Sequence, residues 1–164
     1  MDYQDGDPSG MGKNEHRAPW GCIFAKEDKS KCKPGKIPKS DQEYFEALCL
    51  CVLQAGLSWG MIRKNWSKIK KGFYAFDITK LSKVTMSELI KRPGVYNNKK
   101  KVKAIIANAN EFQKIKREFG AFPNFLISLK KLKDKEAIER LTQRFKHVGE
   151  YTGEYYLHCI GYWL

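Results

Sequence analysis

The sequence predicts an all-α fold, and three features of its pattern support this prediction. From residue 40 onward, apolar residues recur at intervals of three and four, which is the spacing of one helix face. No stretch alternates between apolar and polar residues for long, as a half-buried strand would. Helix-capping residues and glycines recur at short intervals, so we expect short connections and a helical bundle.

Two regions are expected along the chain of 164 residues. Residues 1–39 have little periodicity and are interrupted by Pro19, Pro34 and Pro38, so we expect an irregular N-terminal arm. Residues 40–164 carry the helical pattern and are expected to form the folded domain. The first twenty residues are polar and no apolar run reaches roughly 18 residues, so we expect no signal peptide, no membrane span and an intracellular location.

The first predicted helix begins after Ser40, whose hydroxyl can cap it, and Glu43 follows at the spacing of a capping box. This helix is expected to end near Ala55, before Gly56. Similar signals divide the rest of the chain. Ser58 precedes a helix expected from Trp59 to about Lys71, Asp77 precedes a short turn, and Thr85 and Glu88 precede a helix that ends ahead of Pro93. A long helix closed by Gly120 follows, then a helix from Pro123 to Leu129, and then a helix capped by Asp134 that runs to Phe145. The residues of the long helix expected to face the core are Val102, Ile105, Ile106, Ala109 and Phe112.

Basic residues are unevenly distributed along the chain, whose formal net charge is +13. Residues 1–55 carry 8 Lys/Arg against 9 Asp/Glu, whereas residues 56–164 carry 23 against 9, a net charge of +14. A region of that charge attracts polyanions and accelerates encounters with them. No basic amphipathic helix with a wide aromatic face stands out, so DNA is a better candidate partner than an anionic membrane.

The five cysteines are Cys22, Cys32, Cys49, Cys51 and Cys159. An odd number, with two of them inside an apolar helix, argues against a disulfide framework. A zinc site at Cys22 and Cys32 would need two more ligands, and the chain contains no CxxC pair and no HxE with PCxxC. This excludes the zinc deaminase signature, and we expect neither a metal nor a cofactor.

The segment from Phe145 to Gly153 joins two helical patterns through a short link that contains Gly149. Glycine tolerates positive φ, so the link is predicted to form a hairpin. The first-turn N–H groups of the second helix would then point outward, where they and the helix dipole suit a phosphate oxygen. The alternative is an ordinary connection between two helices.

Two further segments could contact a nucleic acid. Between the first two predicted helices, Trp59 could stack on a flat ligand and Gln54 could bond its edge; the alternative is a core tryptophan and a solvated amide. The second segment begins the long helix, and its side chains that could grip phosphates are Asn97, Asn98, Lys99 and Lys101. The alternative there is a solvated basic helix start, although lysines at a helix N-terminus oppose its dipole.

In this order, the motifs resemble the helix-hairpin-helix DNA glycosylase superfamily. The segments that closely resemble its 3-methyladenine-DNA glycosylase type I family are Leu50 to Trp59 (Leu-Cys-Val-Leu-Gln-Ala-Gly-Leu-Ser-Trp), Phe76-Asp77, Gly94 to Ala109 and Phe145 to Gly149. The resemblance covers residues 44–164 without large gaps. Arg17 to Trp20 is similar to the family's N-terminal Arg-Cys-x-Trp.

The resemblance implies a two-lobed helical fold with a base pocket between the lobes. It also implies removal of alkylated purines from double-stranded DNA by base flipping, in base-excision repair. Trp59 would stack on the base, Trp20 would be a second aromatic, and Gln54 would read the base edge. A base alkylated on a ring nitrogen is cationic, so an aromatic face attracts it more than it attracts the neutral base.

The resemblance also assigns the hairpin to the DNA backbone. The residues that would contact the backbone there are His147, Val148, Gly149 and Tyr151. Tyr151 stands where the lyase members of the superfamily carry a lysine. We therefore expect a monofunctional glycosylase, a hydrolase that does not cleave the strand, and we expect it to be a monomer.

Three features depart from the family pattern. Cys51 stands where the family has a pocket glutamate, and a thiol supplies no fixed negative charge unless its pKa is strongly lowered. The superfamily's catalytic aspartate lies farther past the hairpin than this chain extends, which leaves Glu150 and Glu154 as the nearest carboxylates. The family's N-terminal zinc ligand is replaced by Ala18, and its C-terminal ligands would lie beyond Leu164.

Two hypotheses for the function follow. The first is a DNA glycosylase that excises 3-methyladenine-like or otherwise damaged bases, with Cys51, Glu150 and Glu154 as candidate catalytic residues. For the two glutamates, the alternative is a favourable interaction with the helix N-terminus. The second hypothesis is a catalytically silent relative that binds DNA or a lesion without cleaving the glycosidic bond.

Overall fold

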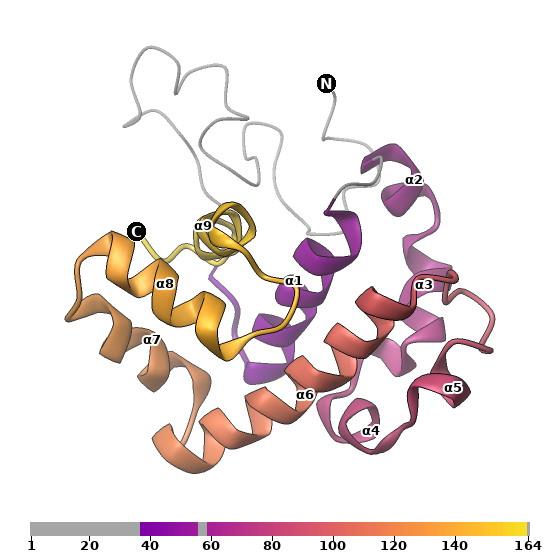
Figure 1. Ribbon diagram of the computed structural model, residues 1–164, viewed down its shortest axis with the longest axis horizontal. Helices are drawn as coiled ribbons and strands as arrows, with labels where there is room; N and C mark the ends of the chain where they lie inside the picture. The colour runs from indigo at the N-terminus through magenta and orange to yellow at the C-terminus, as the bar shows by residue number, and fades with distance from the viewer. Residues whose placement is uncertain (1–36, 56–58, 164) are drawn as a thin grey trace.

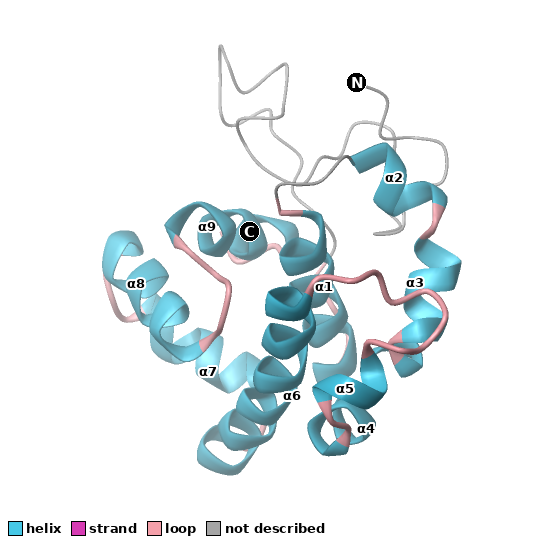
Figure 2. Ribbon diagram, turned by 45° about the vertical axis from the view of Figure 1, so that its right-hand side comes forward, coloured by secondary structure: helices cyan, strands magenta, loops and turns pink. Residues whose placement is uncertain are grey.

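The computed structural model describes residues 37–55 and 59–163, and every regular element in these two ranges is helical, as predicted (Figure 2). The predicted N-terminal arm lies almost entirely outside the described residues, so it stays a prediction. The helices are α1 (Asp41–Gln54), α2 (Trp59–Lys64), α3 (Trp66–Gly72), the 3-10 turn η3 (Tyr74–Phe76), α4 (Ile78–Lys83), α5 (Met86–Leu89), α6 (Lys99–Phe119), α7 (Phe122–Lys130), α8 (Asp134–Arg144) and α9 (Glu150–Cys159).

The helices form two lobes around α1 and α6, as Figure 1 shows. α1 runs through the middle of the molecule, and α6, the longest of the described helices, lies beside it and is shared by both lobes. The short helices α2 to α5 lie on one side, and α7, α8 and α9 lie on the other. α9 packs against both α1 and α8, so the last helix closes against the first. The predicted two-lobed, all-α architecture is confirmed.

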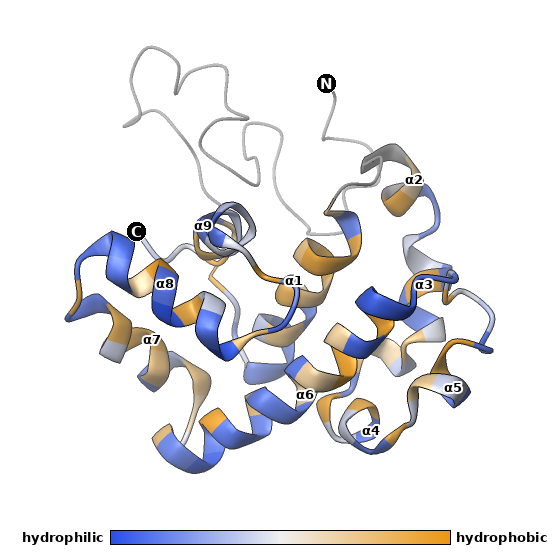
Figure 3. Ribbon diagram, viewed as in Figure 1, coloured by the Kyte–Doolittle hydropathy of each residue, from blue (hydrophilic) through white to orange (hydrophobic). Residues whose placement is uncertain are grey.

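A continuous cluster of buried apolar side chains joins the lobes. α1 contributes heavily, because every residue from Leu48 to Leu53 is buried, and its ribbon is almost wholly hydrophobic there (Figure 3). The predicted inward residues of α6 are buried, except Ile106, which is half-buried against the cluster. Phe112 of α6 stacks on Phe122 of α7 with ring centroids 4.4 Å apart. None of the described helices is both long and apolar enough to cross a membrane.

Several predicted helix caps are present. The Ser40 hydroxyl accepts from the N–H of Glu43 at 3.2 Å. The carboxylate of Glu43 reaches one residue further than predicted and accepts from the N–H of Lys39 at 2.7 Å. The capping box of Thr85 and Glu88 is complete, with both reciprocal bonds. Local capping chemistry therefore sets these two helix starts as the sequence indicates.

Three boundaries differ from the sequence prediction. The helix expected from Trp59 to about Lys71 is divided at Asn65 into α2 and α3. Asp77 caps the helix α4 where a short turn was expected. Asp134 is the first residue of α8 rather than its cap, and Lys133 occupies the cap position without a side-chain bond. A carboxylate in the first turn still complements the helix dipole, which explains why this helix starts there.

Candidate nucleic-acid interface

α8 and α9 are joined by the turn Phe145–Gly149, which we call the hairpin. The turn reverses at His147, whose φ of 59° lies in the left-handed region. Gly149, which was expected to supply positive φ, has a φ of −83° and is the N-cap of α9. The hairpin is therefore present, but the residue assigned to its bend was wrong. A non-glycine residue holds this conformation at a cost of about 1–3 kcal/mol, so the surrounding structure must stabilise it.

An open groove of about 500 Å³ follows the hairpin. It is lined by Ala55 at the end of α1, Thr142 and Gln143 of α8, the hairpin itself, and Thr152 in the first turn of α9. The first N–H groups of a helix have no partners within that helix, and α9 begins at this groove. The groove thus offers an anion a helix N-terminus beside the ammonium of Lys146 and the imidazole of His147, both in the hairpin.

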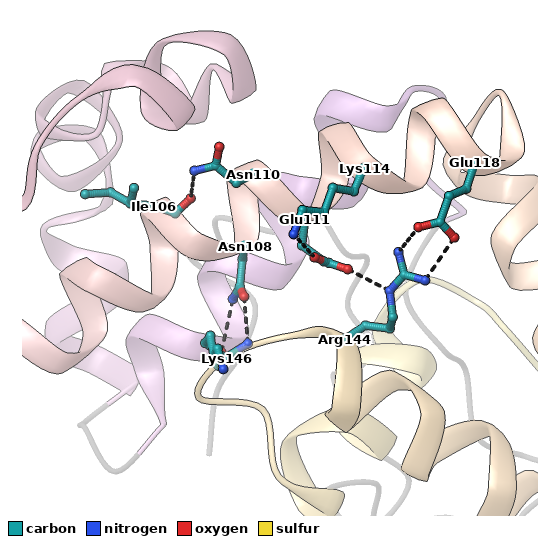
Figure 4. A network of polar contacts seen from close by, with 8 residues as sticks. All are labelled: Ile106, Asn108, Asn110, Glu111, Lys114, Glu118, Arg144 and Lys146. Carbon is teal, nitrogen blue, oxygen red and sulfur yellow. Dashed lines mark hydrogen bonds and ion pairs between the residues drawn. The ribbon is translucent and has the colours of Figure 1, made fainter.

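The start of the hairpin is fastened to α6 (Figure 4). The Nε of Arg144 donates to Glu111 at 2.7 Å, and its terminal nitrogens donate to the two oxygens of Glu118 at 3.0 and 3.1 Å. The bond from Arg144 lowers the pKa of Glu118. The ring of Phe145 is buried against that of Phe112, with centroids 5.4 Å apart. The hairpin therefore starts from two residues held by α6.

Lys101, expected to grip a phosphate, is buried and points into the protein. Its Nζ donates to the carbonyl oxygens of Leu53 at 2.8 Å and Ala55 at 2.5 Å. Lys101 thus caps the C-terminal end of α1, where carbonyls lack intrahelical donors and a cation offsets the dipole. Burial lowers the pKa of its ammonium. The pKa of His147 is also lowered, first by burial and then by the charges of Lys101 and Lys100, so the hairpin lies close to this end of α6.

The other polar residues of this segment have separate places. Asn98 is the N-cap of α6, and its Oδ1 accepts an N–H of the first turn at 3.1 Å. Asn97 and Lys99 are exposed. Tyr96, which sequence reasoning did not single out, donates its hydroxyl to the carbonyl of Leu53 at 2.7 Å, and burial raises its pKa to about 12. A phosphate-binding role for this segment stays a prediction for Asn97, Asn98 and Lys99.

Gln54 and Cys51 lie buried in α1, with exposed fractions of 6% and 3%. The Nε2 of Gln54 donates to the hydroxyl of Tyr155 in α9 at 2.6 Å, so the far lobe orients this amide. Cys51 is a free thiol within the apolar cluster. The base-reading role of Gln54 and the catalytic role of Cys51 stay predictions.

The remaining site candidates lie at the end of the hairpin and in the first two turns of α9. Glu150 is exposed, and Glu154 follows one turn later and is half-buried, so both carboxylates lie on one face of the helix. Tyr151 is 66% exposed. Val148 is buried, which anchors the end of the hairpin in the core. Val148 therefore lines the groove, whereas Glu150, Tyr151 and Glu154 follow it along α9 and are not part of the groove lining.

The side chains of both aromatic residues of the predicted base pocket lie outside the described part of the structure. Trp20 lies outside the described residues. Trp59 is the first residue of α2, but its side chain is outside the described part, as are residues 56–58, including the predicted cap Ser58. Stacking of a base on Trp59 and Trp20 stays a prediction.

Sequence reasoning missed three polar residues that hold the site together: Tyr96, Asn108 and Tyr155. A signal for Asn108 was available, because it lies seven residues after Lys101 on the inward face of the long helix. A polar residue on an apolar face needs a buried partner. No comparable signal marks Tyr96 or Tyr155, whose partners lie more than 40 residues away along the chain.

Comparisons with known proteins agree with this architecture. The DNA-3-methyladenine glycosylase of Haemophilus influenzae is 30% identical over 97 residues, which are 57% of this chain and 52% of that protein. DNA-3-methyladenine glycosylase 1 of Escherichia coli strain K12 is 29% identical over 96 residues, which are 56% and 51% of the two chains. The aligned region thus spans about half the length of these curated relatives.

A solved structure extends the similarity to nearly the whole fold. The 3-methyladenine DNA glycosylase I of Staphylococcus aureus, whose recognition of 3-methyladenine that structure describes, superposes with a TM-score of 0.68 and 25% identity. The superposition covers 86% of this chain and 89% of the other. A family model described as methyladenine glycosylase matches residues 32–154. This chain belongs to the methyladenine glycosylase family.

Proposed function

We propose that this protein is a monofunctional DNA glycosylase that excises 3-methyladenine-like or otherwise damaged bases in base-excision repair. The observation that carries the proposal is the groove that joins the hairpin and the N-terminus of α9 to the end of α1. A helix N-terminus beside the cationic Lys146 suits a DNA phosphate. The end of α1 is followed within a few residues by Trp59, which supports a backbone contact at the groove close to a base stacked on Trp59.

Excision by this site would begin with extrusion of the base. A flipped base leaves the DNA stack, and an aromatic face such as that of Trp59 favours a cationic alkylated base. Gln54, whose amide is oriented by Tyr155, would bond the base edge. The buried position of Gln54 in the last turn of α1, next to the segment that leads to Trp59, supports this role.

The glycosidic bond would then be hydrolysed. Water adds to the sugar carbon as its bond to the base breaks, the bonding electrons leave with the base and neutralise its charge, and the water gives up one proton to the solvent to leave a hydroxyl on the sugar. Glu150 and Glu154 are the first carboxylates after the hairpin along α9, and they would stabilise the positive charge that develops on the sugar. Tyr151 offers no amine for a Schiff base with the abasic sugar, so strand cleavage is not expected.

Double-stranded DNA, a monomeric state and an intracellular location at the nucleoid belong to the same proposal. The net charge of +14 on residues 56–164 supports a polyanionic partner. The closed packing of α9 against α1 and α8 supports a domain that needs no second copy to complete its core.

A base-release assay tests the proposal. The full chain is incubated with methylated duplex DNA and, as a control, with the same duplex untreated. We expect free 3-methyladenine and an equal number of abasic sites from the methylated DNA, with intact strands. Salt-sensitive binding without base release would contradict the glycosylase activity and favour the catalytically silent relative. The observation that favours this alternative is the buried thiol of Cys51.

Replacing Trp59 by alanine is expected to lower kcat/KM for methylated duplex at least about fivefold, because stacking of a base on an aromatic side chain contributes about 1–3 kcal/mol. Binding to undamaged duplex should change little, since no base is flipped. Trp163→Ala is the matched control, because Trp163 is 42% exposed and packs edge-on against Tyr162. Equal activity of the two variants would remove Trp59 from the base pocket.

Gly149→Pro is expected to weaken binding to undamaged duplex about tenfold or more. Proline removes the N–H at the cap of α9, and a hydrogen bond to a charged group contributes about 1.5–3 kcal/mol. Gly149→Ala is the matched variant, because it keeps the N–H and its Cβ would meet nothing within 4 Å. Fluorescence anisotropy at fixed salt measures both affinities, and circular dichroism checks folding. Equal affinities would show that this N–H does not contact DNA.

A further inference from the structure

Asn108 is a buried amide on a helix face that is otherwise mainly apolar. Its exposed fraction is 1%, and its neighbours on that face of α6 include Ala104, Ile105 and Phe112. An amide in such a position is costly unless its donors and acceptor are bonded. The place of Asn108 therefore depends on the partners it finds there.

Both ends of this amide bond to one residue of the hairpin. The Oδ1 of Asn108 accepts from the backbone N–H of Lys146 at 2.7 Å, and its Nδ2 donates to the backbone carbonyl of Lys146 at 3.1 Å. Figure 4 shows the two bonds side by side, with Asn108 facing the hairpin from α6. A single hydrogen bond would let the Lys146 backbone rotate about that bond. Two bonds from the same amide prevent this rotation, so they fix the orientation of Lys146 as well as its distance from α6.

The residue that follows Lys146 makes the bend. His147 has a φ of 59°, and the cost of this conformation must be offset by its surroundings. Arg144 and Phe145 are already held by α6 through their side chains, and Lys146 is the last residue held before the bend. The orientation of the Lys146 backbone therefore sets the direction in which the hairpin enters the groove and α9.

We propose that Asn108 is a positioning residue, which holds the hairpin in the conformation that binds DNA. It does not itself touch the nucleic acid, and the inference rests on the proposed function in that the hairpin must be the DNA contact. If only a fraction of the molecules hold the hairpin in the binding conformation, the apparent Kd for DNA equals the intrinsic Kd divided by that fraction. Without the two bonds, Lys146 and His147 would sample other conformations, whereas Phe145 and Val148 would stay buried in the core.

α6 supplies a matched control for Asn108. Asn110 lies two residues further along the same helix and is exposed; its Nδ2 donates to the carbonyls of Ile106 at 3.0 Å and Ser82 at 3.4 Å. Figure 4 shows it on the side of α6 away from the hairpin. Ile115→Val is a second control, because it removes one buried methylene from α6 and lowers stability without touching the hairpin.

The experiment compares Asn108→Ala, Asn110→Ala and Ile115→Val in the full chain. For Asn108→Ala we expect the Kd for undamaged duplex, and the KM for methylated duplex, to rise about tenfold with kcat nearly unchanged, as a competent fraction of one tenth requires. NMR relaxation dispersion in the free protein should show increased conformational exchange at the backbone amide of His147, whose N–H makes no bond to Asn108. The two controls should bind DNA like the unmodified protein.

The outcomes that overturn the inference are distinct from those that overturn the proposed function. If conformational exchange at the hairpin is unchanged in Asn108→Ala, or if Ile115→Val loses as much affinity at an equal loss of melting temperature, Asn108 has no positioning role. Base release and Gly149→Pro then still test the glycosylase. If conformational exchange at His147 increases but DNA affinity does not change, the hairpin is not the DNA contact, and both the inference and the observation that carries the proposed function fail.

Discussion

Gly94→Ala is expected to destabilise the protein by about 4 kcal/mol, which combines left-handed strain with forced overpacking. Gly94 has a φ of 89°, and a Cβ added there would lie 2.1 Å from the carbonyl oxygen of Lys68 and 2.7 Å from its carbonyl carbon. Both atoms belong to the backbone of α3, so no side chain can move aside. The whole turn that leads into α6 would have to shift.

Gly120→Ala separates the two causes. Gly120 has a similar φ of 85°, but its added Cβ would meet only the Nδ2 of Asn124, at 3.8 Å. This variant should lose about 1–2 kcal/mol from strain alone. Chemical denaturation measures both, and the melting temperature should fall by roughly 10 °C for Gly94→Ala. Equal losses from the two variants would show that the close approach to Lys68 does not exist.

Lys101→Met is expected to cost about 2 kcal/mol of stability, because the carbonyl of Ala55 loses this donor, the carbonyl of Leu53 keeps only the hydroxyl of Tyr96, and the end of α1 loses a compensating charge. Methionine keeps the length and apolar stem of lysine, so the change isolates the ammonium that bonds Leu53 and Ala55. Because these carbonyls precede the segment leading to Trp59, we also expect base release to fall more than binding to undamaged duplex.

Lys103→Met is the control for that experiment. Lys103 lies on the same helix and is exposed, so its replacement removes an equal charge without breaking a buried contact. Its effect on stability should stay within about 0.5 kcal/mol. Urea denaturation of both variants gives the comparison. If Lys101→Met proves as stable as Lys103→Met, the ammonium does not cap α1.

Helix starts that depend on neighbouring residues were predictable, whereas turns that depend on distant contacts were not. The capping box of Thr85 and Glu88 needs only residues three apart, and it forms as expected. The turn η3 is different: all three of its residues, Tyr74–Phe76, have positive φ. The ring of Tyr74 lies 3.6 Å from the guanidinium of Arg92, a contact that no local pattern announces.

The same distinction holds at the site. The hairpin was predictable, because two helical patterns meet there across a few residues. The buried position of Lys101 was not predictable, because a run of three lysines does not show which of them faces inward. Its spacing of four from Ile105 places it on the inward face. Its partners, however, are the carbonyls of α1, and they are set by how α1 packs across α6.

Lys101 and Asn108 lie two turns apart on α6, about 10 Å along its axis at the usual rise per residue. One secures the end of α1 and the other secures the hairpin. A single rigid element therefore separates them, and no flexible loop contributes to the spacing. Under the proposed function, α6 keeps a constant distance between the nucleotide presented for excision and the phosphate bound at the hairpin, whichever lesion that nucleotide carries.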